Sequence, residues 1–216
     1  MQKKIYITAG ILLLSLLFTF NKNIYAQSEF GVKGGATYFG LNNKINSTVF
    51  DFEMRSGLQF GIYYKIHNLL GPIGLQTEFL FQQKGGNFYI RQHENGYPEF
   101  GYDNPGSGYW IRRPQRYNYF SIPIILTVTP LKFLDIYAGP EIGYLFDSNA
   151  KPTDWETNRF SAGVSAGAAF KIDKNTKLDI RYSKDLTRIA DFGDTDIKNY
   201  GWAFTIQRAL LFRKQK

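Results

Sequence analysis

The sequence predicts an all-β fold in which eight antiparallel strands close into an up-and-down barrel. Two observations support this prediction. Apolar and polar residues alternate with a period of two over eight stretches, and the connections between the stretches are alternately short and long. A period of two places successive side chains on opposite faces of a strand. An even number of strands returns both ends of the chain to the same end of a barrel.

The first four predicted strands cover residues 30–41, 57–66, 73–84 and 119–128. Each alternates strictly enough for its apolar face to be identified. That face consists, strand by strand, of Val32, Gly34, Ala36 and Tyr38; Leu58, Phe60, Ile62, Tyr64 and Ile66; Leu75, Thr77, Phe79 and Phe81; Phe120, Ile122, Ile124, Leu126 and Val128.

The last four predicted strands cover residues 134–144, 160–171, 178–186 and 200–212. The stretch 160–171 differs from the others, because small residues occupy much of both faces. The apolar faces consist, strand by strand, of Leu134, Ile136, Ala138 and Ile142; Phe160, Ala162, Val164, Ala166, Ala168 and Phe170; Leu178, Ile180 and Tyr182; Trp202, Phe204 and Ile206.

The connections indicate which environment surrounds the barrel. The three short connections are 67–72, 129–133 and 172–177, and the four long ones are 42–54, 85–118, 145–159 and 187–199. Bacterial outer-membrane barrels have short periplasmic turns and longer extracellular loops. The sequence therefore predicts an outer-membrane barrel with both mature termini in the periplasm. A soluble, lipocalin-like ligand carrier is the alternative, because periodicity alone does not tell which face meets water.

The polar face carries the charges of the strands, whereas the apolar face carries almost none. Eight strands enclose a space that side chains can fill, and an unpaired charge in it is costly. We therefore expect the inward charges to pair into a plug, with no general solute pore; a narrow gated channel is the alternative. The predicted lumen network consists of Lys33, Glu78, Glu141, Asp179 and Arg181, near the further inward charges Lys65 and Asp135.

The first 26 residues predict a signal peptide. Lys3 and Lys4 precede an apolar run over residues 5–20, and cleavage is expected between Ala26 and Gln27. The mature barrel domain would then span residues 27–216. The chain has 26 Lys and Arg against 18 Asp and Glu, and no cysteine. This modest basic excess does not predict a nucleic-acid partner, and thiolate metal sites and disulfides are excluded.

Three residues do not fit regular strands. Pro123 and Pro140 fall inside predicted strands, although a proline lacks the N–H that a closed ladder needs. We expect a β-bulge at one or both, with a local break in the ladder. Arg208 interrupts the apolar face of the last strand; either it reaches lipid head groups or it marks another bulge.

Five segments resemble the PorT-type outer-membrane β-barrel family of Bacteroidota, often labelled porin family: FGVKGG (30–35), YFSIPI (119–124), YAGPEIG (137–143), residues 163–170 and LDIRY (178–182). The resemblance covers the mature chain and includes both prolines. It implies an outer-membrane barrel. Because the founding member serves a type IX secretion and gliding apparatus, it also implies a role as a subunit of an envelope or secretion complex. It implies no catalytic or binding residues.

Catalytic and metal-binding patterns are weak. Residues 163–167 match G-x-S-x-G, but Ser165 lies in mid-strand with no helix after it, so we do not expect a nucleophile. His67 and His93 are predicted at opposite ends of the barrel, which argues against a histidine-based hydrolase, protease or metal centre. A barrel-borne lipid-modifying enzyme is a less favoured alternative. The acidic cluster Asp191, Asp194 and Asp196 could hold calcium, although acidic loop tips are usually only solvated. We expect no enzyme activity, cofactor or metal.

The long connection 85–118 is the best binding candidate, because tyrosines and arginines make adaptable contact surfaces. Outer-membrane lipid and lipopolysaccharide are the expected partners of a monomeric barrel, with an envelope protein complex as a further partner. In the alternative interpretation the flanking strands simply extend, the aromatic residues pack the hairpin and the arginines touch lipopolysaccharide phosphates. The predicted contact residues are Tyr89, Arg91, Tyr102, Trp110, Arg112, Arg113 and Arg116.

Overall fold

A computed structural model describes residues 27–42, 50–70, 72–92, 109–149, 158–192 and 195–214. The predicted signal peptide, up to Ala26, lies outside these residues. The strands, in chain order, are β1 (Gln27–Asn42), β2 (Phe50–Leu70), β3 (Ile73–Gln92), β4 (Tyr109–Leu131), β5 (Leu134–Ser148), β6 (Phe160–Lys171), β7 (Thr176–Asp185), β8 (Ala190–Phe192) and β9 (Thr195–Lys214).

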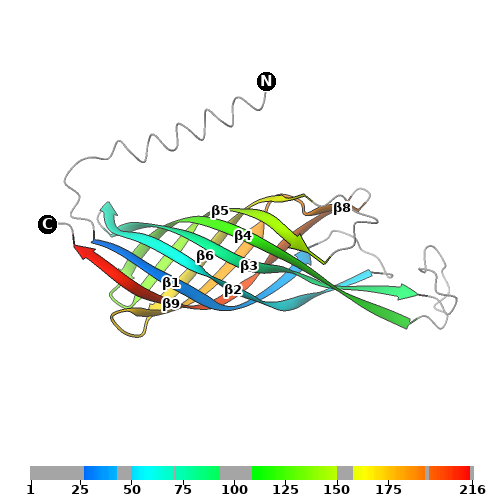
Figure 1. Cartoon of the computed structure of the whole chain (residues 1–216), viewed down its shortest axis with the longest axis horizontal. Helices are drawn as coiled ribbons and strands as arrows, with labels where there is room; N and C mark the ends of the chain where they lie inside the picture. Colours follow the sequence, from blue (N-terminus) through cyan, green and yellow to red (C-terminus); the bar gives the residue numbers. More distant parts are fainter. Residues whose placement is uncertain are drawn as a thin grey trace, which may run out of the picture.

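Eight of the strands form a closed antiparallel ring, which confirms the predicted fold class (Figure 1). Each strand pairs with the next, and β1 pairs with β9 to close the ring, from Gln27 opposite Lys214 to Asn42 opposite Lys198. The first and last described residues of the chain therefore lie together, at the end of the barrel that has the tight turns. We call this end the turn end and the opposite end the loop end. The short strand β8 was not predicted and forms a small hairpin with the start of β9 at the loop end.

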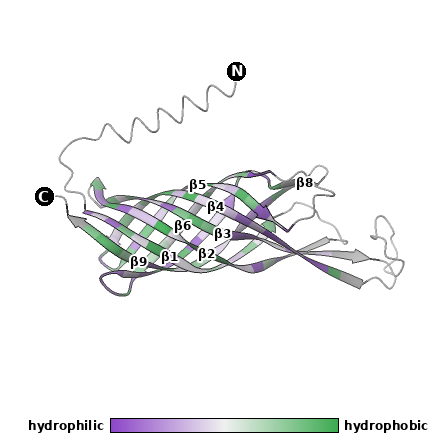
Figure 2. Cartoon of the chain, viewed as in Figure 1, coloured by the Kyte–Doolittle hydropathy of each residue, from purple (hydrophilic) through white to green (hydrophobic). Residues whose placement is uncertain are grey.

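Hydrophilic and hydrophobic residues alternate along the strands (Figure 2), and the two faces of the wall have the predicted chemistry. The buried charged side chains point inward, such as Arg181 with 0% of its surface exposed, together with apolar ones such as Leu80, while the exposed outward side chains, such as Leu58, 58% exposed, are mostly apolar. This arrangement is the reverse of a soluble carrier, whose apolar face would line a cavity. Among the described residues, no helix is long and apolar enough to span a membrane.

The turns at the turn end are shorter than predicted. Leu70 pairs with Ile73 and Leu131 with Leu134, so the strands continue almost to the turn itself. In the third turn, the carboxylate of Asp173 accepts the N–H groups of Asn175 (2.7 Å) and Thr176 (2.8 Å). These hydrogen bonds hold the pKa of Asp173 below its usual value, because they stabilise the charged carboxylate.

At the loop end, β3 and β4 run much further than the predicted limits of residues 84 and 119. Their pairing continues as far as Gln92 opposite Tyr109, so much of the predicted connection 85–118 is strand. Only residues 93–108 separate the two strands, and they lie outside the described part of the chain. The alternation fails here because residues 85–92 and 109–118 mix polar and aromatic side chains on both faces.

The expected bulge at the prolines is wrong, whereas the expected break in the ladder is present. The register is the same on both sides of each proline: Ile122 pairs with Ile142, and Leu126 with Ala138. The ladder between β3 and β4 skips the pair that Pro123 would form, and the ladder between β4 and β5 skips that of Pro140. Each proline, which lacks an N–H, therefore interrupts the ladder locally, and no extra residue is inserted as a bulge would require.

A bulge does occur close to Arg208. The register between β1 and β9 shifts by one residue, because Gly31 pairs with Ala209 whereas Phe30 pairs with Leu211. Arg208 itself is exposed on the outer face, opposite Thr176 at the turn end. Exposed Leu210 and Phe212 lie between Arg208 and the end of β9, so Arg208 interrupts the apolar face as the sequence indicates.

The seam between β1 and β9 depends on a close backbone approach, which yields a stability prediction. A Cβ atom at Gly35 would lie 2.1 Å from the carbonyl oxygen of Phe204, whereas one at Gly34 would have its nearest neighbour at 3.8 Å. We expect Gly35→Ala to destabilise the folded barrel by about 1–3 kcal/mol, because two backbones must separate. Gly34→Ala should leave stability within about 0.5 kcal/mol. Urea unfolding in detergent micelles, followed by tryptophan fluorescence, measures both, and equal stability of the two variants would contradict the prediction.

Candidate functional site

The centre of the lumen contains a cluster of four charged side chains from β1, β3 and β7. Arg181 binds Glu78 through two parallel hydrogen bonds, from Nη1 to Oε2 (2.8 Å) and from Nη2 to Oε1 (2.6 Å). The ammonium group of Lys33 lies 2.8 Å from Asp179 and 3.4 Å from Glu78. All four side chains have no exposed surface. The two positive and two negative charges balance, so this middle cluster is neutral.

Neutral side chains complete the hydrogen bonding of the middle cluster. The hydroxyl of Tyr137 donates to Asp179 (2.5 Å), and Thr205 donates to the other oxygen of the same carboxylate (3.0 Å). The guanidinium of Arg181 also lies 5.1 Å from the centre of the Tyr137 ring. Multiple partners for each buried charge are what a low-dielectric environment requires.

A second cluster lies above the middle one, toward the loop end. The ammonium group of Lys84 lies 3.1 Å from Glu141 and 2.9 Å from Asp185. The same group lies over the rings of Phe39 and Tyr119, at 5.6 Å and 5.3 Å from their centres. With one cation and two carboxylates, this upper cluster has an excess of one negative charge.

An apolar cap closes the lumen above the upper cluster. Ile189 and Ile197 come from the β8–β9 hairpin, and a backbone hydrogen bond of 2.8 Å joins them. Both are 1% exposed and pack with buried residues of the wall. The complete cluster consists of Leu41, Tyr117, Tyr119, Leu145, Ile189 and Ile197.

A third cluster lies at the turn end. Glu29 accepts a hydrogen bond from Tyr63 (2.5 Å), and its other oxygen lies 2.8 Å from Nε2 of His67. Lys177 lies between two carboxylates, 3.4 Å from Glu29 and 3.3 Å from Asp135. Lys65 also binds Asp135, at 2.7 Å. This lower cluster has equal numbers of lysines and carboxylates, and His67 forms its edge.

The structure divides the five predicted lumen residues between two clusters. Lys33, Glu78, Asp179 and Arg181 form the middle cluster, whereas Glu141 belongs to the upper one with Lys84 and Asp185. Sequence reasoning missed Lys84, although it has the same parity along its strand as Glu78. It also missed Glu29 and Lys177, because both were placed just outside their strands.

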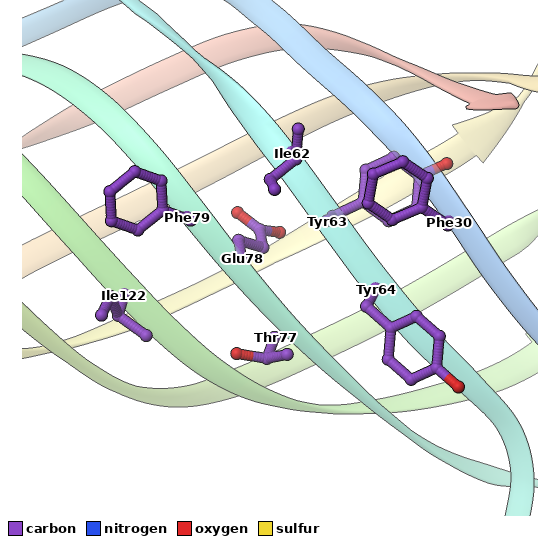
Figure 3. A pocket seen from close by; sticks show the side chains of 8 residues that line it. All are labelled: Phe30, Ile62, Tyr63, Tyr64, Thr77, Glu78, Phe79 and Ile122. Carbon is purple, nitrogen blue, oxygen red and sulfur yellow. The ribbon is translucent and has the colours of Figure 1, made fainter.

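The outer wall has a groove of about 200 Å³ that extends over the four neighbouring strands from β1 to β4 (Figure 3). Outward apolar side chains such as Ile62, Phe79 and Ile122 line it, whereas Glu78 behind them belongs to the lumen. The groove therefore opens on the apolar face of the wall and is separate from the buried ion pairs.

The predicted contact surface at the loop end is described only in part. Arg112 and Arg113 are exposed, Arg116 is half-buried, and the hydroxyl of Tyr89 donates to Glu53 (2.6 Å). Tyr102 lies outside the described residues, and the side chains of Arg91 and Trp110 are not described. Tyr89, Arg112, Arg113 and Arg116 lie on the extended β3–β4 hairpin, in agreement with the interpretation that the flanking strands extend.

The candidate catalytic residues do not come together. Ser165 lies in the middle of β6, between Gly139 of β5 and Ser183 of β7, and its buried hydroxyl has no hydrogen-bond partner. His67 binds Glu29 in the lower cluster, and His93 lies outside the described residues. Among the described residues, no group of three or more His, Asp and Glu side chains is arranged to hold a metal ion. The side chains of Asp191 and Asp196 are not described and Asp194 is outside the described part, so the acidic cluster considered for calcium lies outside the described side chains.

Three solved structures align with most of this chain at low sequence identity. Neisserial surface protein A shares 10% identity at a TM-score of 0.48, covering 85% of this chain and 99% of its own. The attachment invasion locus protein Ail of Yersinia pestis, solved with the heparin analogue sucrose octasulfate, shares 13% at 0.45 and covers 86% and 99%. The outer-membrane protease OmpT of Escherichia coli shares 9% at 0.42 and covers 89% and 99%.

No curated protein matches the sequence. Residues 21–191 match the family described as "Outer membrane protein beta-barrel domain", a range that includes β1 to β7. A match over this length, together with the closed ring of strands and the apolar outer face, assigns the chain to a family. The protein belongs to the outer membrane protein β-barrel domain family.

Proposed function

We propose that this protein is an occluded outer-membrane barrel with a structural or interaction role at the cell envelope. The observation that supports this most strongly is the lumen, where three layers of paired charges occupy the barrel from the turn end to the apolar cap. In the proposed orientation the turn end, with both termini, faces the periplasm, and the loop end faces outward.

The paired charges oppose transport through the lumen. Five buried cations and six buried carboxylates, each at most 5% exposed, bridge strands that face one another across the barrel. Separating one buried partner from another leaves an uncompensated charge at a cost of about 3–5 kcal/mol. A gated channel would need to break the Arg181–Glu78 pair and also displace the apolar cap, so we favour the closed interpretation.

The loop end offers the surface for interaction. The β3–β4 hairpin projects beyond β5, whose last paired residue, Ser148, lies opposite Tyr117 of β4. The hairpin presents tyrosine and arginine side chains, which are residue types enriched at recognition surfaces. We propose that a monomeric barrel uses this hairpin to contact outer-leaflet lipid and a protein of an envelope complex. The PorT-type assignment, and with it a link to type IX secretion, stays a prediction.

The occluded lumen predicts the behaviour of the protein in planar bilayers. We expect no stable large conductance from the purified wild type, because ion pairs fill the lumen. We also expect none from Glu78→Gln or Glu141→Gln, because the other charge layers and the apolar cap remain. The measurement is single-channel recording, with a bacterial porin as the positive control for insertion. Stable openings of either variant would favour the gated channel instead.

The Arg181–Glu78 pair predicts non-additive effects on stability. Arg181→Met should destabilise the barrel by about 3–5 kcal/mol, because Glu78 then remains buried with only Lys33 as a cationic partner. The double variant Arg181→Met with Glu78→Met should regain much of this loss, since no charge is stranded. Urea unfolding in micelles supplies the double-mutant cycle, and additive losses would show that the pair is not coupled.

The absence of cysteine from the chain allows a test of orientation. We introduce single cysteines by Arg113→Cys on the hairpin and by Lys174→Cys in the third tight turn. A membrane-impermeant maleimide should label the first variant in intact cells and the second only after the outer membrane is permeabilised. The reverse pattern would show that the proposed orientation is inverted.

A further inference from the structure

Three arginines gather where the β3–β4 hairpin leaves the barrel wall. Arg55 lies on β2, where it pairs with Phe39 of β1, and Arg116 lies on β4 opposite Gly85 of β3. On the same strand, Arg112 lies four residues from Arg116, so that the two share a face of the hairpin. Gly85, with a φ of 119°, lies on β3, between the strands that carry Arg55 and Arg116.

The positive charges of this cluster are not compensated. In the described part of the chain, no carboxylate lies within 4.0 Å of Arg55, Arg112 or Arg116. Two nearby carboxylates have other partners, since Glu53 accepts a hydrogen bond from Tyr89 (2.6 Å) and Asp147 accepts one from Asn118 (2.6 Å).

The guanidinium groups of Arg112 and Arg116 repel that of Arg55. Partial burial lowers the pKa of Arg55, and the charges of Arg116 and Arg112 lower it further. Like charges that face one another without a counter-ion are destabilising, and an anion bound between them would remove this cost.

The guanidinium of Arg116 has an unsatisfied donor. Its Nε atom is buried and has no hydrogen-bond partner. The backbone on either side is fixed by Asn149, whose Oδ1 accepts the N–H of Arg116 (2.6 Å) and whose Nδ2 donates to the carbonyl of Pro114 (3.0 Å). The backbone therefore holds Arg116 in place, although its side chain has not satisfied its donors.

The cluster lies at the height where the apolar outer face ends. Ser56, the neighbour of Arg55, pairs with Tyr38, an outward residue that is 47% exposed. On β4, Arg116 lies one residue beyond Tyr117, which pairs with Ser148 of β5. Phe146, two residues before Ser148, is an exposed apolar residue. At about 3.3 Å per residue, Arg55 and Arg116 lie within roughly 10 Å of the apolar band, where lipid head groups are concentrated, and Arg112 lies four residues further from the band than Arg116.

We infer that Arg55, Arg112 and Arg116 form a binding site for phosphate groups carried by the head group of an anionic glycolipid in the outer leaflet. The fork of donors on each guanidinium matches the oxygens of a phosphate, and three forks suit a head group with two phosphates. The inference rests on the proposed orientation, in which the loop end faces the outer leaflet. It goes further by assigning the phosphate contacts to a defined set of three arginines, of which Arg55 lies outside the predicted contact surface.

The test counts bound lipid on the full-length folded barrel in neutral detergent by native mass spectrometry. The probes are bisphosphorylated lipid A and the same lipid with both phosphates removed. The site variant carries Arg55→Gln, Arg112→Gln and Arg116→Gln, and the control variant removes the same charge through Lys132→Gln, Arg159→Gln and Lys174→Gln. A further variant replaces the three site arginines by lysine, and heat-modifiable gel migration shows that each variant is folded.

We expect the site variant to bind the bisphosphorylated lipid about tenfold more weakly than the wild type, or weaker still, because several charge-assisted hydrogen bonds are lost. The control variant should stay within about twofold, and the lysine variant should fall between them, since it keeps the charge but not the fork. The dephosphorylated lipid should bind all four proteins equally weakly.

Equal losses in the site and control variants would overturn the inference, because net charge alone would then explain binding. Binding that ignores the phosphates would overturn it as well. Inorganic pyrophosphate that binds as tightly as the lipid would replace the lipid by a soluble anion as the ligand. Conductance of the wild type would contradict the occluded lumen and leave these binding results unaffected, so the two proposals fail separately.

Discussion

The structure depends on one constraint, which is that a closed wall of eight strands leaves an interior without room for bulk water. Every charge that points inward must therefore find a partner across the lumen. The chain satisfies this requirement in layers, and the bidentate pair of Arg181 and Glu78 lies at the centre. Because the partners come from β1, β3 and β7, no two of which are neighbours in the ring, these contacts join separate parts of the wall, with β3 opposite β7.

The same constraint separates the roles of the two ends. At the turn end, strands continue almost into the turns and the lower cluster fills the mouth, so little backbone is left to form a binding surface. At the loop end, the β8–β9 hairpin covers the lumen with Ile189 and Ile197, while the β3–β4 hairpin extends beyond the wall. The lumen is thus sealed on its upper side by apolar packing, and recognition is left to the surface outside the cap.

The buried ion pairs also explain why the lumen offers no catalytic group that a substrate could reach. A catalytic group must be able to reach a substrate, whereas Ser165 and the charged side chains beside it are enclosed by the wall and by one another. The unpaired cations outside the lumen are different, because solvent and lipid reach them. The proposed recognition site therefore consists of Arg55, Arg112 and Arg116, even though the lumen contains more charged residues.

The sequence by itself determined the closed eight-stranded fold, the inward and outward faces and the alternation of short and long connections, because each depends on a period of two and on chain length between strands. It also indicated which charges point inward. Only the tertiary structure decided how these charges are sorted, since Glu141 and Glu78 share a face in sequence yet bind different cations in space. The extension of β3 and β4, the apolar cap and the gathering of Arg55 with Arg112 and Arg116 likewise required the register between strands. Register and shear depend on the whole ring, and no local pattern records them.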